Sequence, residues 1–157
     1  MADNTTPAAA ATSEQNGDKQ IMLQRIYVKD CSFESPRSPA VFATPMTPEI
    51  TVNMHTNTQL LEDGNIEVVL QVTAEASFEQ RTVFLVEVQQ AGLFTIKGFN
   101  EQEQAVLLAT YCPNILFPYL REVVSDLTLK GSMAPLLLQP VNFDALYAQQ
   151  AGDTGNN

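Results

Sequence analysis

The chain has 157 residues, 45% of them apolar, and its eighteen acidic and eight basic side chains give a formal net charge of −10. One domain with a single core fits this length, and the negative charge argues against nucleic acid, whose affinity comes largely from Lys and Arg neutralising phosphates. No apolar stretch approaches the roughly 20 residues that cross a bilayer, and the N-terminus lacks the basic leader and apolar core of a secretory signal, so we expect a cytoplasmic protein.

Both ends of the chain are predicted to be flexible tails. Residues 1–20 are rich in Ala, Thr, Asn and Gly and show no apolar periodicity, and residues 151–157 have the same character. Such segments bury too little apolar surface to offset the entropy lost on ordering. The fold is therefore expected within residues 21–150.

Four strands are predicted in chain order, over residues 21–33, 50–54, 66–78 and 82–96. The first two are separated by a Pro-rich stretch, residues 36–48, which cannot continue a hydrogen-bonded ladder. Apolar residues alternate without interruption from Ile66 to Phe78, which is typical of a half-buried strand. The polar residues 79–81 join this strand to the next and predict an antiparallel hairpin.

The pattern changes after Gly98, where apolar residues recur at spacings of three and four as far as Leu127. This spacing predicts one long amphipathic helix. Pro113 and Pro118 each lack a backbone donor, so a break or kink is expected near residues 112–114, and Gly131 ends the helix.

A short final helix is expected from Asn142, which can cap it, to about Gln150. Strands followed by helices, without βαβ alternation, indicate the α+β class. We therefore predict a four-stranded antiparallel sheet packed with a long kinked helix and a short C-terminal helix.

Residues for catalysis are scarce in this chain. His55 is the one histidine, Cys31 and Cys112 are the two cysteines, and neither a phosphate-binding glycine loop nor a metal-ligand cluster is present. We expect no enzyme, no metal and no cofactor. A Cys–His hydrolase that uses Cys112 and His55 is the alternative, but both residues lack a local signature, and His55 is expected at the surface.

Two predicted strands each carry acidic residues on one of their faces. Asp30 and Glu34 lie on the same face of the first strand, about 13 Å apart at about 3.3 Å per residue. Leu85 and Glu87 lie on the face of the fourth strand opposite Phe84. An apolar side chain beside acids suits a basic, partly apolar partner, unless the long helix covers that side of the sheet.

The string from Tyr111 to Tyr119, YCPNILFPY, resembles the central helix motif of the SecB family of protein-export chaperones. Three further segments resemble that family: residues 24–34 its first strand, residues 84–90 its hairpin, and residues 140–146 its last helix. The resemblance covers about residues 22–150.

This resemblance implies an ATP-independent chaperone, assembled as a homotetramer that is a dimer of dimers. It would hold unfolded precursor proteins in a translocation-competent state and deliver them to the SecA motor of the Sec translocase. Position by position, Asp30, Glu34, Leu85 and Glu87 match the family's SecA-docking surface. The same four residues stand out in the strand pattern, as one pair on each of the two strands.

The resemblance also implies long apolar grooves for client chains between the sheet, a crossover loop and the long helix. Candidate groove residues are Ile50, Val52 and Met54 on one strand face, with Phe84 and Tyr119 as aromatic candidates. Each of them suits an ordinary core position equally well. A rival function within the family is a SecB-like chaperone that controls a toxin–antitoxin pair.

Overall fold

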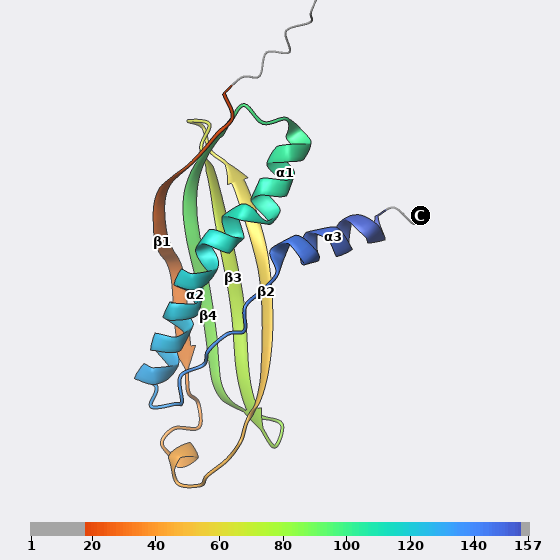
Figure 1. The fold of residues 1–157 in the computed structure, drawn as a ribbon. Coiled ribbons are helices and arrows are strands. Elements are labelled where there is room, and N and C mark those ends of the chain that lie inside the picture. The colour runs from red at the N-terminus through yellow and green to blue at the C-terminus, as the bar shows by residue number, and fades with distance from the viewer. Residues whose placement is uncertain (1–17, 155–157) are drawn as a thin grey trace, which may run out of the picture.

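The computed structural model describes residues 18–154. In chain order the elements are β1 (Gln20–Glu34), the short 3-10 helix η1 (Ala40–Phe42), β2 (Glu49–Leu60), β3 (Ile66–Phe78), β4 (Arg81–Lys97), α1 (Glu101–Ala109), α2 (Tyr111–Lys130) and α3 (Phe143–Asp153). The predicted fold class is confirmed: a four-stranded sheet, a long bent helix formed by α1 and α2, and a short C-terminal helix (Figure 1).

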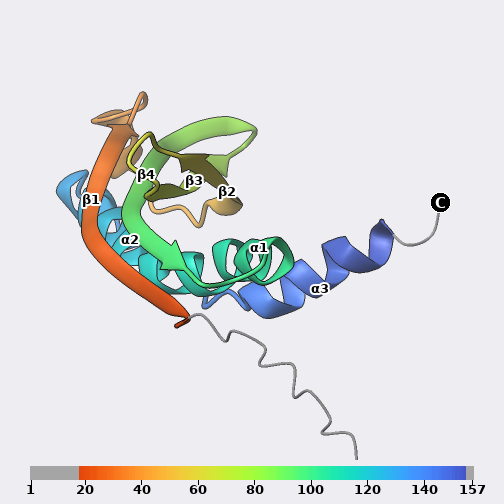
Figure 2. The ribbon, with the colours of Figure 1, turned by 90° about the horizontal axis from the view of Figure 1, so that it is seen from above.

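The strands form one antiparallel sheet in the order β1-β4-β3-β2, so β1 and β2 are its edges. The Pro-rich stretch carries the chain from one edge to the other between β1 and β2. Seen from above, the sheet curves around the helices, and α1 and α2 lie on one of its two faces (Figure 2). We call this the helix face and the opposite one the outer face.

The β3–β4 hairpin turns at Glu79 and Gln80, whose φ angles of 52° and 59° are both left-handed. Two consecutive left-handed residues are what a two-residue hairpin needs to match the twist of its strands. The predicted hairpin is therefore present.

β2 is longer than the predicted strand of residues 50–54, since it continues to Leu60. Thr56 and Thr58 follow Met54 on the same strand face, so the apolar alternation that marks the strand ends before the strand does. An edge strand half open to water needs no apolar residue there.

The bend in the long helix lies at Thr110, two residues before the predicted range of 112–114. Thr110 has φ −123° and ψ −65°, and α2 starts directly after it. A proline ring clashes with the carbonyl four residues earlier and disfavours helical geometry just before it. The break therefore precedes Pro113, which sits in the first turn of α2, where no backbone donor is needed.

Both predicted helix caps are confirmed at the other boundaries. The Asn142 side chain accepts a hydrogen bond of 3.0 Å from the Ala145 backbone N–H at the start of α3, and Gly131 follows the last residue of α2. Residues 1–17 of the predicted N-terminal tail lie outside the described residues, whereas Gln20 already pairs with Lys97. At the other end α3 reaches Asp153.

The core lies between the helix face and α2. Leu70 and Val72 of β3 are completely buried, as are Leu116, Leu120 and Val124 on α2. The helix lies close to the sheet at Gly92, where an added Cβ would lie 2.9 Å from Leu116 Cδ2. This packing holds α1 and α2 across the sheet and leaves the outer face without a helix.

Candidate protein-binding surfaces

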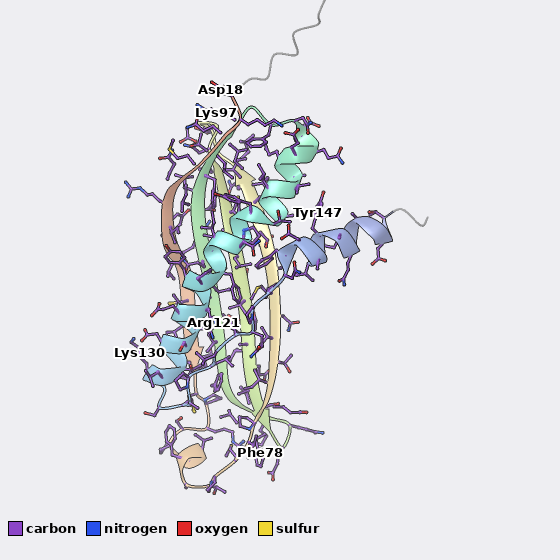
Figure 3. All side chains as sticks on the ribbon, viewed as in Figure 1. Asp18, Phe78, Lys97, Arg121, Lys130 and Tyr147 are labelled. Carbon is purple, nitrogen blue, oxygen red and sulfur yellow. The ribbon has the colours of Figure 1, made fainter. Side chains whose placement is uncertain are left out.

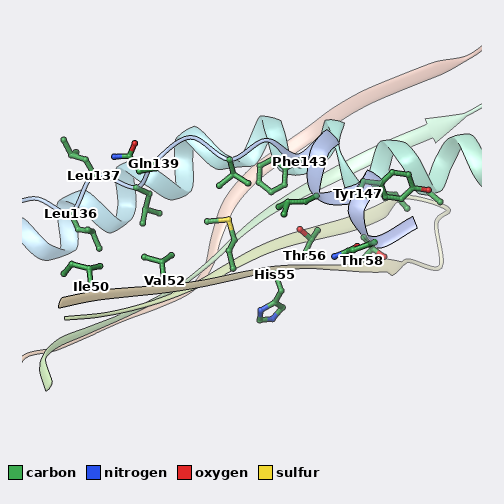
Figure 4. Close-up of a pocket in the computed structure, with 18 residues that line it drawn as sticks. Ile50, Val52, His55, Thr56, Thr58, Leu136, Leu137, Gln139, Phe143 and Tyr147 are labelled. Atoms are coloured by element: carbon green, nitrogen blue, oxygen red, sulfur yellow. The ribbon is translucent and has the colours of Figure 1, made fainter. Parts of the chain in front are cut away.

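A groove of about 890 Å³ opens between the edge strand β2 and the helices. One wall is the helix face of β2, and the others are α1, the segment of residues 136–141 and the start of α3 (Figure 4). Its apolar lining residues are Ile50, Val52, Met54, Ala105, Leu108, Ala109, Leu136, Leu137, Leu138, Val141, Phe143 and Leu146, with Tyr147 beside them. We call this the edge groove.

Side chains of α2 hold the groove wall in place. Thr128 is fully buried, and its hydroxyl accepts a hydrogen bond of 2.9 Å from the Leu136 backbone N–H. Arg121, labelled in Figure 3, donates from Nε to the Leu138 carbonyl at 2.9 Å. These two bonds hold the segment that follows Gly131 against α2. Each joins a side chain of the helix to a backbone group of that segment, so the segment returns along the helix.

Several apolar side chains along the edge groove are incompletely covered. Ile50 and Val52 are each 42% exposed, Leu146 is 46% exposed and Leu137 is 55% exposed. Contiguous exposed apolar surface of this kind is typical of a surface that another molecule covers. An elongated groove beside a free strand edge suits an extended polypeptide with apolar side chains.

The five predicted groove residues occupy three different environments. Ile50, Val52 and Met54 lie together on the helix face of β2 and line the edge groove. Phe84 is only 4% exposed, lies in the core and stacks on Phe33 with ring centroids 6.0 Å apart. Tyr119 is 51% exposed on α2 and does not line the groove.

The opposite wall was not anticipated from the sequence. Leu136, Leu137 and Leu138 form an apolar run directly after a helix that ends at Gly131. A run of three leucines with no helical or strand periodicity around it is unusual for an exposed connection. That run is the signal that could have indicated a second wall.

Strand pairing brings the four predicted docking residues together on the outer face. Glu34 pairs with Leu85, and Ser32 pairs with Glu87. Asp30 pairs with Gln89 on the same face, because side chains directly across a ladder share a face. We call Asp30, Glu34, Leu85 and Glu87 the acidic face.

The acidic face is open in this structure. Asp30, Glu34 and Glu87 are exposed, and Leu85 is partly buried between neighbouring strands. Phe84, Val86 and Val88 point to the helix face and are at most 4% exposed, as expected from the alternation in β4. The long helix therefore packs on the other side of the sheet.

Glu75 is a fourth carboxylate on this surface that sequence reasoning passed over. It pairs with Leu85 from β3, so that Leu85 lies between Glu34 and Glu75 across three strands. The Thr82 hydroxyl donates a 2.6 Å hydrogen bond to one oxygen of Glu75. The register between β3 and β4 was needed to place Glu75 there.

The geometry of Cys112 and His55 does not suit nucleophilic catalysis. Cys112 is completely buried, and this burial raises the pKa of its thiol to about 12. A nucleophilic thiol needs the opposite shift, since the thiolate is the reactive form. His55 is exposed on β2 and points away from the groove interior (Figure 4).

Residues 18–154 show neither a cluster of metal ligands nor a helix suited to span a membrane. No three His, Cys, Asp or Glu side chains in this part of the chain come close enough together to hold a metal ion. None of the helices described has the length and hydropathy that a membrane span requires.

Comparison with known proteins gives consistent results. The family model described as preprotein translocase subunit SecB matches residues 14–154. The protein-export protein SecB of Methylococcus capsulatus is 54% identical over 136 residues, which cover 87% of this chain and 88% of the relative. The protein-export protein SecB of Legionella pneumophila is 48% identical over 139 residues, which cover 88% of this chain and 86% of the relative.

Among solved structures, a SecB-like chaperone of Mycobacterium tuberculosis in complex with a ChAD peptide from an antitoxin aligns with a TM-score of 0.64. The two chains are 21% identical, and the alignment covers 77% of this chain and 90% of the other. The sheet and the bent helix thus define a SecB-like chaperone fold. With the family model and the relatives of about 50% identity, the chain belongs to the SecB family of protein-export chaperones.

Proposed function

We propose that this protein is a cytoplasmic, ATP-independent chaperone that binds unfolded precursor proteins and delivers them to SecA. The observation that carries the proposal is that the edge groove and the acidic face lie on opposite faces of one sheet. The edge groove lies on the helix face beside β2, and the acidic face lies on the outer side of β1 and β4. A client chain and a motor protein can therefore be bound at the same time.

The edge groove suits unfolded chains because its contacts are apolar and unspecific. Ile50, Val52 and Leu146 present apolar surface without a pocket for one particular side chain. Unfolded proteins share exposed apolar side chains and free backbone groups, which such a groove and its neighbouring strand edge can bind. Nothing in this recognition requires ATP.

The acidic face suits a basic segment of SecA. Glu34 and Glu87 flank the partly covered Leu85, so a partner with cationic side chains around an apolar one is complementary. Charges at an exposed surface mainly accelerate association and are screened by salt. SecA binding is therefore expected to weaken as the ionic strength rises.

Exposed surfaces outside the edge groove support assembly into a tetramer, a dimer of dimers. Tyr111, Tyr119 and Leu129 of α2 are 43%, 51% and 58% exposed. β1 pairs only with β4 among the described strands, so its other edge is free to pair with a second copy. A tetramer would carry several grooves, and a long client bound by more than one would gain avidity.

An export role is favoured over control of a toxin–antitoxin pair. The relatives of about 50% identity are protein-export proteins, whereas the chaperone solved with an antitoxin peptide is 21% identical. The latter comparison supports the fold and leaves the partner open.

The test is the double substitution Asp30→Ala and Glu87→Ala. We expect its affinity for purified SecA to fall about tenfold, since each exposed charge contact contributes up to about 1 kcal/mol. Suppression of client aggregation stays at the wild-type level, because neither residue lines the edge groove. Unchanged SecA affinity would contradict the assignment of the docking surface.

The matched control is Glu62→Ala with Asp153→Ala. It also removes one Asp and one Glu, both exposed, from the β2–β3 turn and the end of α3. A similar loss of SecA affinity in this control would show that total charge, and not the acidic face, attracts SecA.

A further inference from the structure

β1 contains an extra residue immediately before the acidic face. Val28 pairs with Gln90, and the next pair along the ladder is Asp30 with Gln89. Lys29 thus has no partner of its own on β4, which is the definition of a β-bulge. A bulge changes which face the following side chains occupy, because the side-chain period of a strand is two.

A regular ladder would reverse the orientation of the docking residues. Without the extra residue, Asp30 would pair with Val88 and Glu34 with Phe84, both of which point to the helix face. Two carboxylates would then enter the core side of the sheet, and Phe33 would turn to the outer face. The bulge at Lys29 therefore decides that Asp30 and Glu34 join Leu85 and Glu87.

A polar network on the outer face ties the bulge to the centre of the sheet. Lys29 extends across β4, and its Nζ lies 2.6 Å from Glu67 Oε1 on β3. The Tyr27 hydroxyl donates to the other oxygen of the same carboxylate. Glu67 thus accepts hydrogen bonds from side chains on both sides of Val28, the last residue paired before the bulge.

The network is more enclosed than an ordinary surface ion pair. The Glu67 side chain is 13% exposed, and its bonds to Lys29 and Tyr27 hold the pKa of its carboxyl below the ordinary value. From the helix face, the buried Gln90 donates from Nε2 to the Tyr27 carbonyl at 3.0 Å. β1 is thus anchored beside the bulge from both faces of the sheet.

We propose that Glu67 is a positioning residue for partner docking, which fixes the bulge at Lys29 and thereby the orientation of Asp30 and Glu34. This inference rests on the proposed docking of SecA at the acidic face. Glu67 itself pairs with Leu93, four residues beyond Gln89 on β4, so it acts through Lys29 and Tyr27 without contacting the partner.

The test is Glu67→Gln, which keeps the size of the side chain and removes the charge that holds Lys29. Affinity for purified SecA is expected to fall at least fivefold, while suppression of client aggregation stays at the wild-type level. Lys29→Met breaks the same ion pair from the other side and gives the same result if the network acts as described. Circular dichroism and a thermal melt establish that both variants are folded.

A double-mutant cycle separates positioning from a general loss of stability. In the wild-type background Asp30→Ala weakens SecA binding, and in the Glu67→Gln background it adds less than a further twofold loss, because Asp30 is already misplaced. Losses that simply add would overturn the inference. The control Glu103→Gln removes the ion pair with Lys19, 3.2 Å long and remote from the acidic face, and leaves SecA binding unchanged.

Failure of the inference and failure of the proposed function give different results. If Asp30→Ala weakens SecA binding and Glu67→Gln leaves it within twofold, Glu67 does not position the docking residues, whereas the docking surface stands. If Asp30→Ala with Glu87→Ala leaves SecA binding intact, the docking surface itself is refuted, and this inference with it.

Discussion

The edge groove leads to a quantitative prediction for Ile50→Ser with Val52→Ser. Each of these side chains is 42% exposed, so a bound client chain can cover that remaining part. Complete burial of a Val or Ile side chain is worth about 2 kcal/mol. Covering the exposed 42% then contributes about 0.8 kcal/mol per residue, and the double variant should bind an unfolded client roughly 15-fold more weakly.

The assay is a titration of a fluorescently labelled, permanently unfolded polypeptide, followed by anisotropy. Leu60→Ser is the matched control, because Leu60 is on the same strand and is 70% exposed but does not line the edge groove. Its Kd should stay within twofold of the wild-type value, and the far-ultraviolet circular dichroism of both variants should match the wild type. Equal losses in the control and the double variant would refute the role of the groove.

Two further predictions concern the core. Gly92→Ala places a Cβ 2.7 Å from Phe94 Cε2 and 2.9 Å from Leu116 Cδ2, so urea unfolding should show a loss of about 1–3 kcal/mol from overpacking; a loss below about 0.5 kcal/mol would contradict so close a contact. Burial raises the pKa of the Cys112 thiol from 9.0 to about 12. This thiol ionises first in the unfolded chain, so its stabilising effect is complete below pH 9 and is lost as the pH rises towards 12. Between pH 8 and pH 10 the wild type should lose about 1.4 kcal/mol more than Cys112→Ala, and parallel pH profiles in urea unfolding would contradict the shift.

Much of the fold could be predicted because its elements have strong local patterns. The alternation from Ile66 to Phe78 gives the limits of β3 to the residue, and Asn142 marks the start of α3. β2 was predicted too short because threonines replace apolar residues in its second half. The helix break was misplaced by two residues because a proline acts on the residues that precede it.

The spacing of apolar residues in β1 indicates its two bulges, which the strand prediction did not include. Its helix-face residues are Ile21, Leu23, Ile26, Val28, Cys31 and Phe33, at spacings of two, three, two, three and two. A spacing of three inside an alternating strand indicates an extra residue that flips the faces. The pairing shifts at Gln24 and Lys29 agree with that spacing.

The edge groove was predicted only in part because its two walls are about 80 residues apart in the chain. Ile50 and Val52 were identified on one wall, but the position of Leu136 opposite them depends on the bonds from Thr128 and Arg121 to the segment after α2. Phe84 and Val52 are apolar residues in the same kind of alternating pattern, yet one is in the core and the other at the edge. Local periodicity reports which face a side chain takes, not what covers that face.

The sequence by itself determined the α+β class, the hairpin, the acidic excess and the SecB family, because all of these follow from local alternation, composition and a distinctive string of residues. The tertiary structure decided which sheet face the helix covers, where the groove opens and that Asp30, Glu34, Leu85 and Glu87 meet on one surface. The physical reason is that strand register and helix packing arise from contacts between distant segments. A single unpaired residue, Lys29, is enough to exchange the two faces of β1.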